Sequence, residues 1–431
     1  MSAPTPDSVV FLDAKKGPAC SRAFFVSEFS EWYRAAAADR SRTGFRLTNK
    51  HRITLLSFLA YFAMSGMLSP MGILSAPIAE HFGHTVEDIT ARFSWLTMGI
   101  LVGAILALVV FDWIRLRNLM MLVYGLIAAS LVSLLYVDNL ALVGIVLGLV
   151  GVCSGIGLPG AALTISKTYE TKQRASMLVI TDGCFSIAGI FCSWLAVFLL
   201  AREFHWSGVY QFVALVTVAI IVLSAVSVLP ATDNENPQPE TQSVPWSPGV
   251  WLCLAALFLY TLGQWSILLW IPNYAESALG AAREESGQLI GQFWMGMFAA
   301  QIFVAWWVMK IGVRKLVMIS SITTTLFSIP LWFYGDMQIL LILATIWGFA
   351  NLGLLKITLS FATQLVRVPT ARLVSSLLLG ATVGTAVSPW ITSQIVVATD
   401  NHFVLQFGTG CYAIMTVLLF VAAQKYYKRT T

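Results

Sequence analysis

Two charged residues lie deep inside apolar stretches of the sequence, where a charge is costly unless it meets water or an opposite charge. Asp182 lies eight residues after Arg174, and Lys356 lies eleven residues before Arg367. At the helical rise of about 1.5 Å per residue, these spacings correspond to about 12 Å and about 16 Å. Both charges are therefore predicted at comparable depth in the same half of a membrane.

Each of the two charges has competing interpretations. Asp182 is either a proton- or ion-coupling carboxylate or a latch that bonds to the adjacent loop. Lys356 either binds an anionic group in a cavity, closes a gate against Asp182, or extends its ammonium group to the membrane surface. Opposite charge and matched depth motivate the gate hypothesis.

The apolar stretch 249–273 holds the richest set of polar and aromatic side chains. Its members are Tyr260, Gln264, Trp265, Trp270 and Asn273. Tyr260 and Gln264 are four residues apart and share a helix face. An amide that donates and accepts hydrogen bonds, beside indole rings, suits a neutral or zwitterionic small solute. Interhelical hydrogen bonding, with aromatic side chains at the lipid interface, is the alternative, and Asn351 has the same two interpretations.

A smaller polar group lies in the stretch 53–79, which contains Tyr61, Ser65 and Ser69. The two serines share one helix face, and Pro70 removes a backbone hydrogen bond, which predicts a kink. Helix breaks in transporters often lie at the site or the hinge, whereas close packing of small residues is the alternative interpretation.

The composition requires that a bilayer be the main solvent of this chain. Of 431 residues, 58% are hydrophobic and 11% are charged, whereas soluble domains average about half apolar and about a quarter charged. A disordered chain, a nucleic-acid binder and a soluble enzyme are thereby excluded. The net charge of +5 comes from basic residues at predicted membrane edges, which is no nucleic-acid footprint.

Twelve apolar stretches are long enough to cross a bilayer, since a helix needs about 20 residues to do so. They are 53–79, 93–113, 119–136, 140–166, 176–201, 207–229, 249–273, 288–309, 315–334, 338–365, 373–397 and 404–424. The predicted fold is an all-α membrane protein with twelve transmembrane helices in two pseudo-symmetric six-helix bundles. The predicted parts are a tail at 1–52, bundles at 53–229 and 249–424, a linker at 230–248 and a tail at 425–431.

Basic residues gather in the loops on one side and leave only Arg92, Arg202 and Arg283 on the other. The positive-inside rule therefore places both termini and the linker in the cytoplasm. The tail at 1–52 is expected to be disordered, with a short amphipathic surface helix over 23–38 as the alternative.

Acidic residues mark the side opposite the basic loops. Glu80, Glu87 and Asp88 lie there beside His81, with Arg92 spaced to pair with Asp88. We interpret them as solvated surface charges that contribute little stability.

The two halves of the chain resemble each other. Trp95-x-x-Met98 recurs as Trp294-x-x-Met297, and Gly157-Leu158 recurs as Gly353-Leu354. Two six-helix repeats about an axis along the membrane normal are the plan of one large class of transporters. On these features the chain resembles the major facilitator superfamily.

The loop Asp112-Trp-Ile-Arg115-Leu-Arg117 is similar to the acid-then-basic loop motif of that superfamily. The resemblance implies a cytoplasmic latch in which the acid pairs with arginines. We add Glu170 and Arg174 to this latch, from the loop between the predicted spans 140–166 and 176–201. The equivalent loop of the second half departs from the pattern, because Lys310 stands near the expected acid.

The superfamily lines its central cavity with helices 1, 4, 7 and 10. The resemblance therefore implies cavity candidates, which are Tyr61, Ser65, Tyr260, Gln264, Trp265, Asn351 and Lys356.

A narrower resemblance is to the TsgA-like branch of the superfamily. It rests on Tyr169-Glu170-x-x-Gln173-Arg174-x-Ser176, Thr181-Asp182-x-x-Phe185-Ser186-x-Ala188-Gly189, Phe198-Leu-Leu-Ala-Arg202, Leu262-Gly263-Gln264, Trp270-Ile271-Pro272, Tyr274-Ala275, Phe293-Trp294-Met295 and Val368-Pro369. It covers about residues 49–425 and implies a bacterial inner membrane, but no substrate. Some similar fucose-type permeases carry acids in helices 1 and 4. The stretches 53–79 and 140–166 contain no Asp or Glu, so that proton-coupling scheme does not carry over.

The expected function is secondary active transport of a small polar solute across the bacterial inner membrane by alternating access, with or without a coupling proton. The alternatives are a drug or metabolite efflux carrier of the same superfamily and a non-transporting membrane sensor or scaffold. No HExxH motif, Walker loop or metal-spaced cysteine pair occurs in the sequence, so we expect no enzyme, metal or cofactor. The expected partners are the solute, a coupling proton or ion, and the lipid bilayer, with no nucleic acid and a monomeric chain.

Overall fold

The chain is helical in every part that the structure describes. The computed structural model describes residues 48–230, 246–333, 335–351, 353–366 and 371–426. Among these residues, ten helices are long and apolar enough to cross a membrane, and a bent helix pair brings the number to eleven. The prediction of an all-α membrane protein is therefore confirmed.

The first half of the chain forms one bundle. Its helices are α2 (Asn49–Leu68), α3 (Met71–Phe82), α4 (Val86–Trp113), α5 (Leu116–Ser133), α6 (Leu140–Thr168), α7 (Thr171–Ala201) and α8 (Gly208–Val226). Helix α4 packs along α6, α5 along α8, and α2 against α6, α7 and α8.

The second half forms another bundle. Its helices are α9 (Pro248–Leu279), α10 (Arg283–Ile311), α11 (Val313–Ser328), the short 3-10 helix η1 (Ile329–Trp332), α12 (Met337–Ala350), α13 (Leu354–Thr363), α14 (Ala371–Ala398), α15 (Asn401–Val421) and the π-turn η2 (Ala422–Tyr426). Helix α9 packs against α14 and α15, and α10 packs against α12.

The predicted span at 288–309 corresponds to α10, which is not among the ten apolar helices. The number ten counts the described residues alone, and the side chains at positions 305, 306, 308 and 309 of α10 lie outside them. Within the described part, α10 carries glutamines at 288, 292 and 301. Two of these glutamines bond to other helices. Gln301 donates to Ser186 Oγ of α7 over 3.0 Å, and Gln292 accepts from Thr345 Oγ1 of α12 over 2.8 Å. A polar helix is stable in a bilayer when its polar groups are paired in this way.

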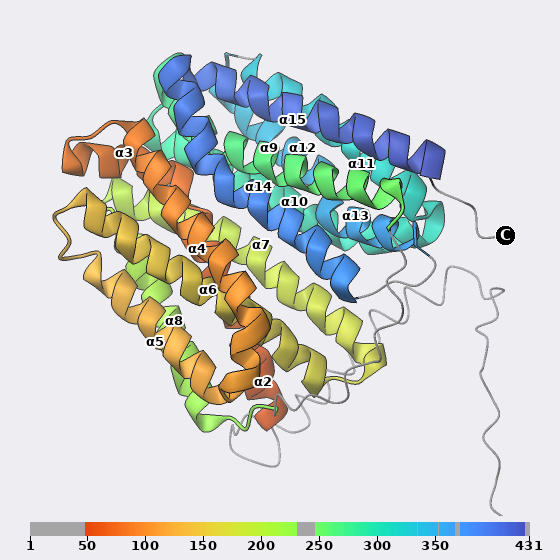
Figure 1. Cartoon of the computed structure of the whole chain (residues 1–431). Helices are drawn as coiled ribbons and strands as arrows, with labels where there is room; N and C mark the ends of the chain where they lie inside the picture. Colours follow the sequence, from red (N-terminus) through yellow and green to blue (C-terminus); the bar gives the residue numbers. More distant parts are fainter. Residues whose placement is uncertain (1–47, 231–245, 334, 352, 367–370, 427–431) are drawn as a thin grey trace, which may run out of the picture. The chain divides into compact units, whose positions relative to one another are not determined.

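The two bundles meet mainly through two pairs of helices, α4 against α14 and α7 against α10, and α3 makes smaller contacts with α9 and α10. Figure 1 shows the first-half helices in red to yellow-green gathered on one side and the second-half helices in green to blue on the other. The predicted tail at 1–52 and linker at 230–248 lie outside the described residues, except for positions 48–52, 230 and 246–248. The start of α2 at Asn49 shows that the first helix begins a few residues before the predicted span.

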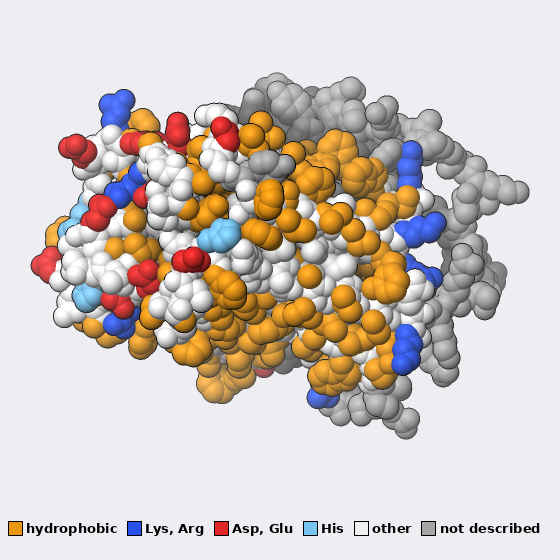
Figure 2. All heavy atoms as spheres, turned by 90° about the horizontal axis from the view of Figure 1, so that it is seen from above, with side chains coloured by type: hydrophobic (Ala, Val, Ile, Leu, Met, Phe, Trp, Pro, Cys, Tyr) orange, Lys and Arg blue, Asp and Glu red, His pale blue; other side chains and the backbone are white. Residues whose placement is uncertain are grey.

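The outer surface is apolar between two polar ends. Leu108, Leu215 and Ile302 are 72%, 69% and 66% exposed, which would be unfavourable in water over so large an area. Figure 2 shows this hydrophobic belt between two ends, one with Asp, Glu and His side chains and a few Lys or Arg side chains, the other with Lys and Arg side chains. Lipid is the solvent that such a belt requires.

Glycines allow equivalent helices of the two bundles to touch through their backbones. A Cβ atom on Gly151 of α6 would lie 2.1 Å from the Leu96 carbonyl oxygen of α4. A Cβ atom on Gly348 of α12 would lie 2.0 Å from the Phe293 carbonyl oxygen of α10. Small residues at a crossing permit this approach in membranes, where packing rather than hydrophobicity drives association.

Two membrane helices are broken. Helices α2 and α3 meet at Ser69–Pro70 with a bend of 49°, so the predicted Pro70 kink is confirmed. Helices α12 and α13 are separated at Asn351–Gly353, where Gly353 adopts φ +63°. This left-handed conformation is one that glycine adopts without the steric penalty of a Cβ atom. The second break was not predicted from the sequence.

Gly348→Ala should destabilise the protein, because the added methyl group meets a backbone carbonyl that cannot move alone. We expect a loss of about 1–3 kcal/mol, the usual range for overpacking. Thermal unfolding of the purified protein in detergent measures it. Gly125→Ala in α5 is the matched control, since no atom lies within 4 Å of its Cβ position. Equal stability of the two variants would contradict the close α10–α12 contact.

Candidate transport site between the two bundles

The deepest charges of the two bundles are in direct contact. Lys356 Nζ of α13 forms an ion pair with Asp182 Oδ2 of α7. The Lys356 side chain is 44% exposed and that of Asp182 is 29% exposed, so neither charge is fully buried by the protein. Of the three roles considered for Lys356, the contact matches pairing with Asp182. The alternative pairing of Asp182 with the loop before α7 is not seen among the described residues.

The broken helix positions Lys356. The break places this residue in the first turn of α13, two residues after Leu354 begins the helix. Asn351 lies on the other side of the break, where its Nδ2 donates to the Trp347 carbonyl over 2.7 Å. Its Oδ1 is buried and has no partner among the described residues. Ser320 Oγ of α11 donates to the Asn351 carbonyl over 3.1 Å, which holds the end of α12 in place.

An aromatic cluster fills the second bundle beside this break. The ring centroids of Phe293 and Trp347 are 4.4 Å apart, and those of Trp347 and Tyr412 are 6.4 Å apart. Trp265 lies 6.4 Å from Trp294 by the same measure. The indole Nε1 atoms of Trp294 and Trp347 are buried without a hydrogen-bond acceptor in the described part of the chain.

The residues predicted on α9 divide into two groups. Tyr260 lies 6.3 Å from Tyr412 of α15 between ring centroids and is 4% exposed, so it packs inside the second bundle. Trp270 is fully buried. Gln264 is 6% exposed, and its amide makes no hydrogen bond to any described residue. Its amide atoms are not among the fully buried polar atoms that lack a partner, so they retain some accessible surface, and Gln264 stays a solute-binding candidate on this helix.

The two serines predicted on the first helix contact each other. Ser65 and Ser69 are buried and bond to each other through their Oγ atoms over 3.1 Å. Tyr61 is partly buried on the same helix. The small-residue packing interpretation of the serines therefore agrees with their contacts.

A polar seam closes the bundles at the end opposite the basic loops. A Cβ atom on Gly72 of α3 would lie 2.5 Å from the Leu268 carbonyl oxygen of α9. Asn273 Nδ2 of α9 donates to Ser75 Oγ of α3 over 2.9 Å. This contact between bundles agrees with the interhelical hydrogen-bonding interpretation of Asn273.

An ion-pair cluster extends the seam to the surface. Arg283 of α10 forms two hydrogen bonds with the Glu80 carboxylate of α3, one of them 3.0 Å long. Arg283 Nε also lies 3.7 Å from Glu276 Oε2. Sequence reasoning treated Glu80 as a solvated charge and missed this pairing, because no local pattern connects residues 203 positions apart. A cavity of about 380 Å³ adjoins the cluster and is lined in part by Ile73, Val197 and Glu276.

Two histidines meet on the same side of the protein. The His81 and His205 ring centroids are 5.3 Å apart, and Ser207 Oγ lies 2.8 Å from His205 Nδ1. Partial burial, together with the neighbouring His81, lowers the pKa of His205. The loop before α8 therefore carries a neutral imidazole near neutral pH.

The predicted cytoplasmic latch is not formed as an acid–arginine network. In the described residues, Asp112 makes no ion pair with Arg115 or Arg117. Arg117 instead donates to the Ala225 carbonyl at the end of α8. Peptide carbonyls left free at a helix end are natural acceptors for a guanidinium group.

The loop before α7 behaves similarly. Arg174 Nε donates to the Tyr169 carbonyl over 3.4 Å, and Glu170 is an exposed residue at the start of α7.

On the opposite side of the protein, Asp88 was expected to pair with Arg92. Its Oδ2 atom instead lies 3.6 Å from His84 Nδ1.

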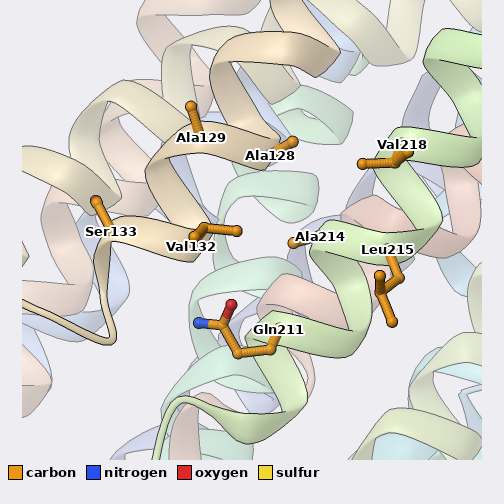
Figure 3. Close-up of a pocket in the computed structure, with 8 residues that line it drawn as sticks. All are labelled: Ala128, Ala129, Val132, Ser133, Gln211, Ala214, Leu215 and Val218. Carbon is orange, nitrogen blue, oxygen red and sulfur yellow. The ribbon is translucent and has the colours of Figure 1, made fainter.

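A separate groove of about 630 Å³ lies between α5 and α8 on the outer face. Figure 3 shows its lining, which comes from Ala128, Ala129, Val132, Ser133, Gln211, Ala214, Leu215 and Val218. Gln211 Nε2 already donates to the Leu131 carbonyl over 2.7 Å. The groove is therefore an apolar surface suited to lipid and lacks the free polar groups that a solute site requires.

The described residues hold no cluster of three or more His, Cys, Asp or Glu side chains that could bind a metal ion. Two helix bundles that meet around a central ion pair, inside a hydrophobic belt, define the architecture of a membrane transporter. Residues 53–291 match the family described as Major Facilitator Superfamily. The chain belongs to this family.

Comparison with known proteins narrows the relationship. The chain is 29% identical to the protein TsgA homolog of Citrobacter koseri over 383 residues, which are 87% of this chain and 96% of the relative. It is 28% identical to the protein TsgA of Shigella flexneri over the same shares of the two chains. The crystal structure of a variant of the nucleoside transporter NupG has the same fold, with a TM-score of 0.70. That match has 13% sequence identity and covers 87% of this chain and 100% of the other.

The seam can be tested by a disulfide between Ser75→Cys and Asn273→Cys, with a protease site inserted in the linker at 231–245. We expect mild oxidation to join the two bundles, so that protease treatment leaves a full-length band on a non-reducing gel. Each single-cysteine variant is a control for the native cysteines, of which Cys153, Cys192, Cys253 and Cys411 are buried. Separation of the halves after oxidation would contradict the seam.

Proposed function

We propose that the protein is a secondary active transporter that moves a small polar solute across the bacterial inner membrane by alternating access. The observation that carries the proposal is the ion pair between Asp182 of α7 and Lys356 of α13, which belong to different bundles. Alternating access rocks one bundle against the other around a site near the midplane. An interaction that joins the bundles on one side of that site must break in each transport cycle.

In this proposal the ion pair is the cytoplasmic gate. The orientation follows from the basic loops, which place both termini in the cytoplasm and the Glu80–Arg283 cluster in the periplasm. The seam at Gly72, Ser75 and Glu80 then closes the periplasmic side in this conformation. Solute would reach Gln264 and the aromatic cluster from the cytoplasmic side once the Asp182–Lys356 pair breaks.

Coupling to a proton follows from the same pair. Protonation of the Asp182 carboxylate would remove the attraction that holds Lys356, because an ion pair needs both charges. One proton could therefore release the gate in each cycle. The absence of Asp and Glu from 53–79 and 140–166 leaves Asp182 as the membrane carboxylate available for this role.

The substrate and the transport activity can be found in two steps. A thermal-shift screen of the purified protein against sugars, carboxylates, amino acids and nucleosides selects ligands, since a ligand that binds the folded state raises its apparent stability. Counterflow of a selected ligand in liposomes then tests transport. Binding without counterflow would favour a sensor or scaffold, and the direction of net movement separates uptake from efflux.

Asp182→Asn and Lys356→Gln should each reduce counterflow at least about tenfold, because each leaves one charge in the membrane interior without its partner. The swapped variant Asp182→Lys with Lys356→Asp should recover part of the activity, since it restores attraction between the bundles. Additive losses with no recovery in the swap would contradict the gate. Gel filtration and thermal unfolding of each variant check that the fold persists.

A further inference from the structure

We infer that Lys356 and the start of α13 form a binding site for the carboxylate of the transported solute, and that the Asp182 carboxylate occupies this site when solute is absent. This inference rests on the proposed transport function and names the class of solute. It differs from a gate alone because it assigns Lys356 a ligand from outside the chain.

The local field at Lys356 is positive from two sources. The ammonium group lies in the first turn of α13, a helix of ten residues. The backbone N–H groups at the start of a helix carry a partial positive charge, so a cation there is disfavoured and an anion is favoured. A carboxylate from another element interacts favourably with both the ammonium group and the partial positive charge at the helix start. In this structure Asp182 supplies it.

The site is open to a solute. Lys356 is 44% exposed although it lies inside a membrane span, and Asp182 is 29% exposed. The exposed ammonium group of Lys356 offers a carboxylate-bearing solute a cation at the start of α13.

Replacement of the Asp182 carboxylate by a solute carboxylate would link solute binding to the opening of the gate. When the bundles separate at this level, Asp182 moves away with the first bundle and Lys356 stays with the second. A solute carboxylate that takes its place keeps the ammonium group paired, which lowers the free energy of the separated state. A neutral solute cannot do this, so the site discriminates by charge. The solute carboxylate and the Asp182 carboxylate therefore compete for one cation.

Competition gives a test that does not need the natural substrate. The probes are acetate and benzoate, with acetamide and benzamide as neutral counterparts of the same shape, and inorganic phosphate as another anion. Binding to the purified full-length protein in detergent is followed by calorimetry and thermal shift. We expect both carboxylates to bind and both amides to fail. Phosphate binding without carboxylate binding would overturn the assignment to carboxylates.

Substitutions of Asp182 and Lys356 separate the internal carboxylate from the cation that it occupies. Asp182→Asn should tighten carboxylate binding on the order of tenfold, within the usual range of coupling between sites, because the internal competitor is removed. Lys356→Arg should keep binding, and Lys356→Gln should abolish it. Asp182→Asn combined with Lys356→Gln should fold without an unpaired charge and should not bind, which controls for loss of structure.

Two results would overturn the inference: no carboxylate binding to the Asp182→Asn variant, or undiminished binding to the Lys356→Gln variant. These failures are distinct from failure of the proposed function. Recovery of counterflow in the swapped variant without carboxylate binding would contradict this inference alone. Carboxylate binding with no counterflow of any ligand would contradict transport and leave the anion site standing.

Discussion

The ion pair between Asp182 and Lys356 is the interaction on which the architecture depends, because each bundle carries a charge that its own helices do not neutralise. A charge inside a membrane protein is stable only when it is paired or hydrated. Contact between the bundles at this level therefore pairs both charges. The break before α13 is part of the same arrangement, since it places the lysine at a helix start and gives solvent access to it.

The two ends of the interface between bundles are built differently. On the side of Glu80, backbones approach closely at Gly72, Asn273 bonds to Ser75, and Arg283 binds the carboxylate. Near the other end, the pair between Asp182 and Lys356 joins the two bundles. Close backbone contact is lost as soon as helices tilt, whereas an ion pair can exchange one partner for another. This difference suits an interface in which one end is sealed while the other responds to a ligand.

Much of the fold could be predicted from composition and local pattern. The helical spans, the Pro70 break and the repeated Trp and Gly pairs all follow from signals within single stretches. The matched depth of Asp182 and Lys356 came from simple spacing, and their contact agrees with it. The break at Gly353 carries no proline to mark it, and Glu80 and Arg283 lie too far apart in the sequence to be connected by pattern. The acid–arginine latch failed because helix-end carbonyls compete for the guanidinium groups, as at Arg117.

The central claim is that the Asp182–Lys356 pair holds the bundles together at the cytoplasmic end, and a distance measurement tests it most directly. Spin labels at Gln173→Cys on α7 and Gln364→Cys beside the end of α13 report the distance between the two bundles by pulsed electron resonance, and both positions are exposed. The parent protein without these two cysteines, treated with the same label, gives the background signal. We expect Asp182→Asn to add a population at longer distance and the swapped charge pair to remove it again. Distance distributions that coincide for the parent and the Asp182→Asn variant would contradict this role of the ion pair.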